Sequence, residues 1–310
     1  MATAAADKDK ISDRVLVGYI DDRRGADAIA LGACAVRGLD VELVLGHVRV
    51  TAWPAVPGPG HVDAEWERFL EEQAQDVLAK GARLAIERGV EPTDLRVMAQ
   101  RGSGRGLAAL ARKVKARAVV IGSAPGGPRT GISLGSTADQ LLHGSPVPVM
   151  IAPKGFADRG VTAFDRVTCA YLRVPESTHA VAAAAAIAAR RRIPLRLLTF
   201  AVDSPVRGKG SAVLAEQQLR RLVDALETDL AQAAREAAAG STLTKRDVIT
   251  QVAEGRDAAQ AVHSAGWTEG DLLVCASSTS GPLRRVFMGD MSMKILRAIP
   301  SPALILPRPT

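Results

Sequence analysis

Aromatic side chains are scarce in this chain of 310 residues, where phenylalanine, tryptophan and tyrosine together make up 3%. Proteins that hold single-stranded nucleic acids usually stack the bases on such rings. The shortage therefore argues against a nucleic-acid partner, although the formal net charge is +7. The basic residues are also scattered, and the arginines at 190–192 close an expected helix, where cations suit the helix dipole. We therefore expect the charge to serve a solvated surface.

Long apolar runs are also missing, since none reaches the ~20 residues that a membrane-spanning helix needs. The opening MATAAADKDK has no apolar segment of the kind found in secretory signals. Cysteine occurs three times, at positions 34, 169 and 275, and neither these residues nor the five histidines show metal-ligand spacing. We expect a cytoplasmic protein with reduced cysteines, no metal site and no membrane partner.

Apolar stretches without polar alternation, typical of strands buried on both faces, alternate with helical patterns along the chain. In the first half, strands are expected at 14–20, 41–48, 95–99, 118–121 and 147–151, with helices at 26–37, 64–88, 107–115 and 137–142. In the second half, strands are expected at 167–172, 195–200, 247–252, 272–276 and 303–306, with helices at 178–190, 211–238, 258–264 and 291–297. We expect Asp63 to cap the helix at 64–88. This alternation predicts an α/β fold of doubly wound parallel sheets.

The two halves of the chain repeat each other. HGSPVPVMIAP at 143–153 aligns with RAIPSPALILP at 297–307, and three prolines coincide at this offset of 154 residues. The same offset pairs Gly135 with Gly289, which indicates an internal duplication. We divide the chain into a disordered tail at 1–12, domain 1 at 13–153, a linker at 154–165 and domain 2 at 166–310.

A glycine-rich segment, GSAPGGPRTGISLGST at 122–137, follows the fourth expected strand. Ligands of open parallel sheets bind beyond the carboxyl ends of the strands, where the strand order reverses. Glycines allow backbone amides to approach a phosphate, and Ser136 opens an expected helix whose free N–H groups attract an anion. The spacing of Ser136 and Asp139 also fits a capping box, which would explain Ser136 without any ligand.

At these residues the chain resembles the universal stress protein family in its tandem two-domain form. The resemblance rests on VLVGY followed by GADAIALG, on the glycine-rich segment, and on the tails LGSTADQLLHGSPVPVMIAP and GPLRRVFMGDMSMKILRAIPSPALILP. It implies two Rossmann-like domains, each a five-stranded parallel sheet of order 3-2-1-4-5 flanked by helices. It also implies that the halves pair through their last strands as a pseudo-dimer, and that the protein is a stress-response binding or regulatory module and not an enzyme.

The ATP-binding members of that family carry G-x2-G-x9-G-S/T after the fourth strand, and this loop wraps the phosphates. Gly122, Gly135 and Ser136 match the pattern. Pro125 stands at the second glycine position and removes one N–H donor, although Gly126 follows at once. The resemblance therefore implies an adenine-nucleotide site in domain 1, with a partly degenerate loop.

An aspartate at the end of the first strand holds the adenosine in those members. Here Ile20 stands at that position, and Asp21 follows one place later. The residues that we expect to bind the nucleotide are Asp21, Gly122, Gly126, Gly135, Ser136 and Thr137.

Domain 2 has lost more of the pattern, and we expect no nucleotide there. Ala276 and Thr279 replace the first two glycines, Leu172 takes the aspartate position, and only Gly289 is retained. Asp290 stands in place of the serine, where its carboxylate would cap a helix but repel a phosphate.

Several alternatives stay open at this point. Domain 1 could act as an ATP-dependent switch or slow ATPase, although no general base is evident near the loop. Ser133 in GISLG matches a nucleophile elbow, but it lies well into the loop and not directly after a strand. Cys169 and Cys275 fall on strands that the implied order makes neighbours, so they are either packed thiols or a redox pair. A homo-oligomer is a further open expectation.

Overall fold

The computed structural model describes residues 13–51, 60–126, 131–174, 176–202, 212–277 and 290–307. The strands of the first half are β1 (Asp13–Gly18), β2 (Val41–Val50), β3 (Asp94–Gln100), β4 (Ala116–Gly122) and β5 (Val149–Ala152). Those of the second half are β6 (Arg166–Ala170), β7 (Leu195–Val202), β8 (Val248–Gly255), β9 (Asp271–Ala276) and β10 (Ala303–Leu306). Within the described ranges they form one ten-stranded sheet of order β3-β2-β1-β4-β5-β10-β9-β6-β7-β8. The expected order 3-2-1-4-5 is thus confirmed in each half.

Helices cover both faces of this sheet. One face carries α1 (Arg23–Val36), α2 (Gly60–Glu87), α5 (Glu176–Arg191) and α6 (Ala212–Ala239). The other carries α3 (Ser103–Lys113), α4 (Ser136–Gly144), α7 (Ala258–Ser264) and α8 (Asp290–Ala298). A short 3-10 helix, η1 (Phe156–Arg159), lies in the linker. Each face has its own apolar core that runs through both halves, which explains why the strands read as continuously apolar.

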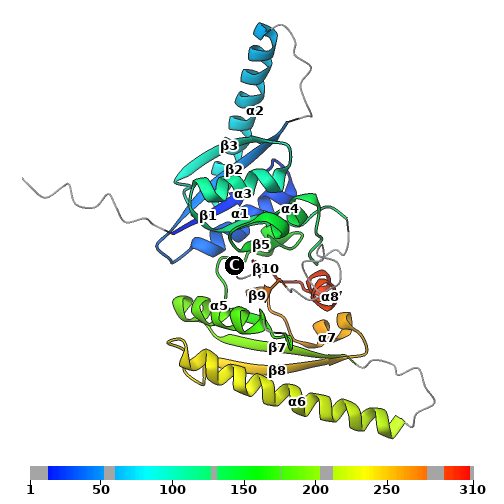
Figure 1. Ribbon diagram of the computed structural model, residues 1–310. Coiled ribbons are helices and arrows are strands. Elements are labelled where there is room, and N and C mark those ends of the chain that lie inside the picture. Colours follow the sequence, from blue (N-terminus) through cyan, green and yellow to red (C-terminus); the bar gives the residue numbers. More distant parts are fainter. Residues whose placement is uncertain are drawn as a thin grey trace, which may run out of the picture.

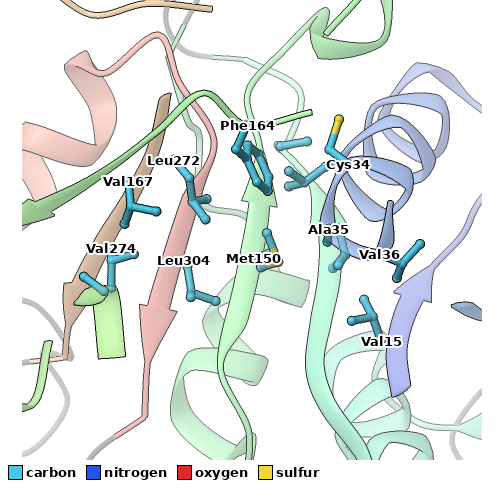
Figure 2. Packing of buried hydrophobic residues seen from close by; sticks show 14 of the residues in the cluster. Val15, Cys34, Ala35, Val36, Met150, Phe164, Val167, Leu272, Val274 and Leu304 are labelled. Carbon is cyan, nitrogen blue, oxygen red and sulfur yellow. The ribbon is translucent and has the colours of Figure 1, made fainter. Parts of the chain in front are cut away.

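The two halves join through β5 and β10, which lie side by side at the centre of the sheet (Figure 1). These strands pair antiparallel, with Met150 opposite Leu304 and Val149 opposite Ile305. Figure 2 shows the Met150 and Leu304 side chains adjacent in the core. The expected pseudo-dimer is therefore confirmed, and the pairing satisfies backbone groups that two separate sheets would leave at apolar edges.

The internal duplication is visible in the elements themselves. Helix α8 begins and ends 154 residues after α4, and β10 stands at the same distance from β5. The central pair thus consists of two copies of one segment in opposite directions, the arrangement that a two-fold axis produces.

Three expected helix starts are wrong. Helix α3 begins at Ser103, four residues before the expected start at 107, with Gly102 as its N-cap residue. Helix α1 begins at Arg23, because the Asp22 carboxylate accepts the backbone N–H groups of Arg24 at 2.8 Å and Gly25 at 3.2 Å. Helix α2 begins at Gly60, so Asp63 lies inside the first turn and is not its N-cap.

The aromatic residues of α2 do not reach the core. Trp66 and Phe69 stack on each other with ring centroids 5.5 Å apart, and both are exposed. In Figure 1 the first part of α2 extends past the sheet. A helical apolar pattern therefore overestimated how much of α2 packs on the sheet.

The strand register separates Cys169 from Cys275. Cys169 lies opposite Val274, so Cys275 is one residue out of step and its side chain points to the other face of the sheet. The two cysteines accordingly belong to different apolar cores. The two cysteines thus lie on neighbouring strands, as expected, but their thiol groups lie on opposite faces of the sheet.

We expect all three thiols to stay reduced and to react slowly in the native protein. Burial raises the pKa of the Cys275 thiol to about 12 and that of Cys34 to about 11, and it also raises the pKa of Cys169. Native labelling should therefore be at least ~100-fold slower than labelling in urea, since access requires opening of the core. Thiol counting after mild peroxide should be unchanged, and rapid loss of two thiols with an intramolecular cross-link would contradict this.

A lysine on β10 should disrupt the pairing of β5 with β10 that joins the two halves. Ile305→Lys places a charge at a position that is 1% exposed on β10, and we expect aggregation or a loss of at least ~3 kcal/mol of unfolding free energy. Thermal unfolding and size-exclusion chromatography measure both effects. Ile249→Lys is the matched control, because Ile249 is also a strand residue but is 44% exposed. A soluble Ile305→Lys protein with unchanged melting would contradict the role of this junction.

Candidate nucleotide site

A cavity of about 300 Å³ opens in domain 1 at the carboxyl ends of β1, β2 and β4. The strand order reverses between β1 and β4, so this is the place where open parallel sheets bind ligands. The strands contribute Gly18, Gly46 and Gly122 to its wall, while α1 contributes Arg24. Ser103 of α3 and the first residues of α4 complete it.

Three glycines of the cavity wall are required by close packing. A Cβ atom at Gly18 would lie 2.6 Å from Leu107 Cδ1, and one at Gly46 would lie 2.9 Å from Leu16 Cδ1. At Gly122 the added atom would lie 2.2 Å from the carbonyl oxygen of Arg24. The end of β4 can therefore pass the first turn of α1 only with glycine at position 122, which fits the expectation placed on that residue.

The amino end of α4 faces the cavity without a side-chain cap. Gly135 is the N-cap residue, and no side chain of the described residues caps this end. The expected capping box of Ser136 and Asp139 is therefore wrong, because Ser136 is the first helical residue and not the cap. Ser136 is exposed and, with Thr137, lines the cavity. Unsatisfied N–H groups at such a helix end attract an anion.

The amino end of α3 is held differently, by a side chain of α4. Gln140 Oε1 accepts the backbone N–H groups of Gly104 at 3.1 Å and Arg105 at 3.2 Å. The hydroxyls of Ser103 and Thr137 lie 2.6 Å apart. These contacts hold α3 and α4 at a fixed distance, so the hydroxyl groups at their amino ends line the same cavity.

The glycine-rich loop is fastened at both described ends. Ser133 N–H donates to Ser123 Oγ at 2.7 Å, and Ala124 N–H donates to the Ser133 carbonyl at 2.9 Å. The Ser133 hydroxyl donates to the Gly126 carbonyl at 2.9 Å. The ammonium group of Lys154, at the start of the linker, donates to the same carbonyl. Ser133 thus secures the loop, and it does not occupy the strand-to-helix turn that a nucleophile elbow requires.

The structure brings most of the expected nucleotide residues together. Gly122, Gly135, Ser136 and Thr137 all line the cavity. Gly126 lines an adjoining cavity of about 650 Å³, which shares Arg24, Ala124 and Pro125 with the first and also contains Lys154.

Asp21 lies elsewhere. Its carboxylate accepts a hydrogen bond from Lys80 of α2 at 2.6 Å and one from the Tyr19 hydroxyl at 3.5 Å. The cavity wall contains Ile20 at this point and not Asp21. The one-residue adjustment that would bring Asp21 into the cavity is therefore absent from this structure.

Sequence reasoning missed Arg24 and Ser103, which follow the first and third strands of domain 1. Both stand at the carboxyl edge of the sheet, so their place after a strand is the signal that could have found them. Arg24 is paired with the Asp22 carboxylate at 2.6 Å.

Domain 2 carries larger residues at two equivalent positions of its sheet. Tyr19 N–H donates to the Gly46 carbonyl, and Tyr171 N–H makes the same contact with Leu198, each at 2.8 Å. Leu198 therefore occupies the position of Gly46, and it is fully buried. Ala170 likewise replaces Gly18, so two glycines of the cavity wall in domain 1 have no counterpart here. The expected glycine Gly289 and the residue Thr279 lie outside the described residues, and the side chain of Asp290 is not described.

Two features of the described residues bear on cofactors and membranes. Within these ranges, no group of three or more histidine, cysteine, aspartate and glutamate side chains is arranged to hold a metal ion. Across the same part of the chain, none of the helices combines the length and apolar character needed to span a bilayer.

Comparisons with known proteins agree on one family. A family model described as the Universal stress protein family matches residues 12–153 and again residues 163–307. A universal stress protein of Mycobacterium tuberculosis (strain ATCC 25618 / H37Rv) is 34% identical over 301 residues, which cover 94% of this chain and 99% of that protein. One from Mycobacterium bovis gives the same values. The crystal structure of a universal stress protein from Archaeoglobus fulgidus DSM 4304 shares the fold, with a TM-score of 0.61 at 17% identity and coverage of 96% of both chains.

Proposed function

Since this chain belongs to the universal stress protein family, we propose that it is a stress-response binding or regulatory protein whose domain 1 takes an adenine nucleotide. The uncapped amino end of α4 on a glycine-walled cavity at the switch point of the sheet carries this proposal. We place the protein in the cytoplasm on the same family grounds.

The two cavities offer different chemistry. Gly18, Gly46 and Val48 form an apolar part of the cavity wall, which suits a purine base. The amino end of α4, with the hydroxyls of Ser136 and Thr137, supplies donors for phosphate oxygens. The adjoining cavity adds the cations Arg24 and Lys154, together with the carboxylate of Asp22 that is already paired with Arg24. Further phosphate groups would find Lys154 there as a hydrogen-bond donor.

We propose binding without turnover. Hydrolysis needs a carboxylate that is free to act as a base or to hold a metal ion. The three carboxylates of the adjoining cavity have other partners. Asp22 caps α1, Asp27 accepts the N–H groups of Gly155 at 3.0 Å and Ala157 at 2.8 Å, and Asp158 binds Arg23 at 3.1 Å. ATP could still act as a switch in domain 1, because a switch requires only that binding alters a conformational equilibrium.

Exchanging one residue between the domains tests the nucleotide site. Ser136 and Asp290 are the first residues of α4 and α8, so Ser136→Asp gives domain 1 the residue of domain 2. We expect this variant to weaken ATP binding at least ~100-fold, because the carboxylate would replace an anion at the helix end. Asp290→Ser should leave binding unchanged. Isothermal titration calorimetry with ATP and AMP, with and without magnesium, measures both.

Gly135→Asp should also abolish binding, but its Cβ would lie 2.8 Å from that of Ala124, so shape and charge change together. Gly135→Ala separates the two, since it adds the atom without the charge. Equal loss of affinity in Ser136→Asp and Asp290→Ser would contradict nucleotide binding at the amino end of α4 alone. Absence of binding by the unaltered protein would contradict the proposed function itself.

A further inference from the structure

The glycine-rich loop of domain 1 rests on a helix of domain 2. We infer that α8 is a structural part of the nucleotide site, with Ile132 as the positioning residue that couples the two domains. This inference depends on the proposed function only for the identity of the ligand.

Ile132 makes the contact. Its side chain is fully buried, although it lies in a loop between Gly131 and Gly135. It belongs to the same apolar core as Ile295, Leu296 and Ile299, which lie on α8 and just after it. The backbone N–H of Ile132 also points at the carbonyl oxygen of Leu296, at 3.4 Å. The loop of one domain is therefore anchored by the other.

The anchor lies close to the residues that would bind the nucleotide. The next residue, Ser133, forms hydrogen bonds with both Ser123 and Gly126. Gly135, the N-cap residue of α4, follows two residues later. A shift of Ile132 must therefore move the start of α4 or break these hydrogen bonds.

A second connection runs through the linker. Lys154 donates to the Gly126 carbonyl of the loop, and Arg159 donates to the Lys154 carbonyl at 3.3 Å. Arg159 also donates to the carbonyl of Pro300, just beyond α8, and lies 3.7 Å from the Glu269 carboxylate. Both connections link the loop with the same end of domain 2.

This arrangement gives domain 2 a task that does not require a ligand of its own. If only the anchored loop binds nucleotide, the apparent affinity falls in proportion to the fraction of molecules in which the loop is anchored. Conversely, bound nucleotide favours the anchored loop and therefore the contact between the domains.

Truncation of the anchor tests the coupling. In Leu296→Ala and Ile132→Ala we expect amide hydrogen exchange of residues 131–136 to become at least ~10-fold faster in the protein without nucleotide, and ATP affinity to fall ~10-fold. Leu230→Ala is the matched control. Leu230 is an equally buried leucine of domain 2, but it lies on α6, on the other face of the sheet. It should leave both quantities within ~2-fold of the unaltered protein, because it touches neither the loop nor α8.

The outcomes separate the two proposals. If Leu296→Ala exchanges and binds like Leu230→Ala, the coupling is overturned. If the unaltered protein binds no nucleotide, the proposed function fails, and the hydrogen-exchange comparison alone decides whether α8 anchors the loop. Should Leu296→Ala fail to fold, Ile132→Val removes a single methylene from the same contact, and restored protection in Ile132→Leu supports a role for volume at this position.

Discussion

The antiparallel pairing of β5 with β10 is the interaction on which the rest of the molecule depends. Each strand has only four residues, and each is the outermost strand of its own half. Their pairing converts two apolar edges into the middle of one sheet and makes both cores continuous through the molecule. The pairing also determines the position of the helix that precedes β10. Helix α8 precedes β10, so the pairing brings it against the loop between β4 and α4 of domain 1.

The duplicated halves have diverged where a ligand would require space. Domain 1 keeps Gly18 and Gly46, and domain 2 has Ala170 and Leu198 at the same places in its sheet. An open cavity forfeits packing contacts, so a half without a ligand gains stability when side chains fill it. Leu198 packs with Ala253 and Ala265 in such a cluster. The replacement of small residues by larger ones is therefore the expected result if only one half keeps a binding function.

Much of this could be predicted from the sequence, because the relevant signals are local. The apolar strands, the glycine-rich segment and the repeated proline pattern each stand in a short stretch of chain. Together with the family resemblance they predicted the fold, the duplication and four of the residues that line the cavity. The errors concern contacts between distant segments. Gln140 caps α3 from α4, a contact without any sequence signature, and Ser136 proved to be helical because Gly135 takes the N-cap position. Whether Cys169 and Cys275 face each other depends on a register of one residue, which the order of strands does not determine.

A buried ion pair shows the same limit and adds to the case for domain 2 as a rigid support. Arg196 is an isolated cation in the sequence, yet its side chain is 2% exposed and lies 3.4 Å from the fully buried carboxylate of Asp271. Arg166 binds the same carboxylate at 2.6 Å, so β6, β7 and β9 are joined by side chains near their amino ends. The equivalent strands of domain 1 pair Leu16 with Val44, where domain 2 pairs Thr168 with Arg196. Loss of one partner of such a pair costs roughly 3–5 kcal/mol, so the geometry of these strands tolerates little change. The ion pairs therefore connect three strands of domain 2, the half whose helix α8 contacts the glycine-rich loop of domain 1.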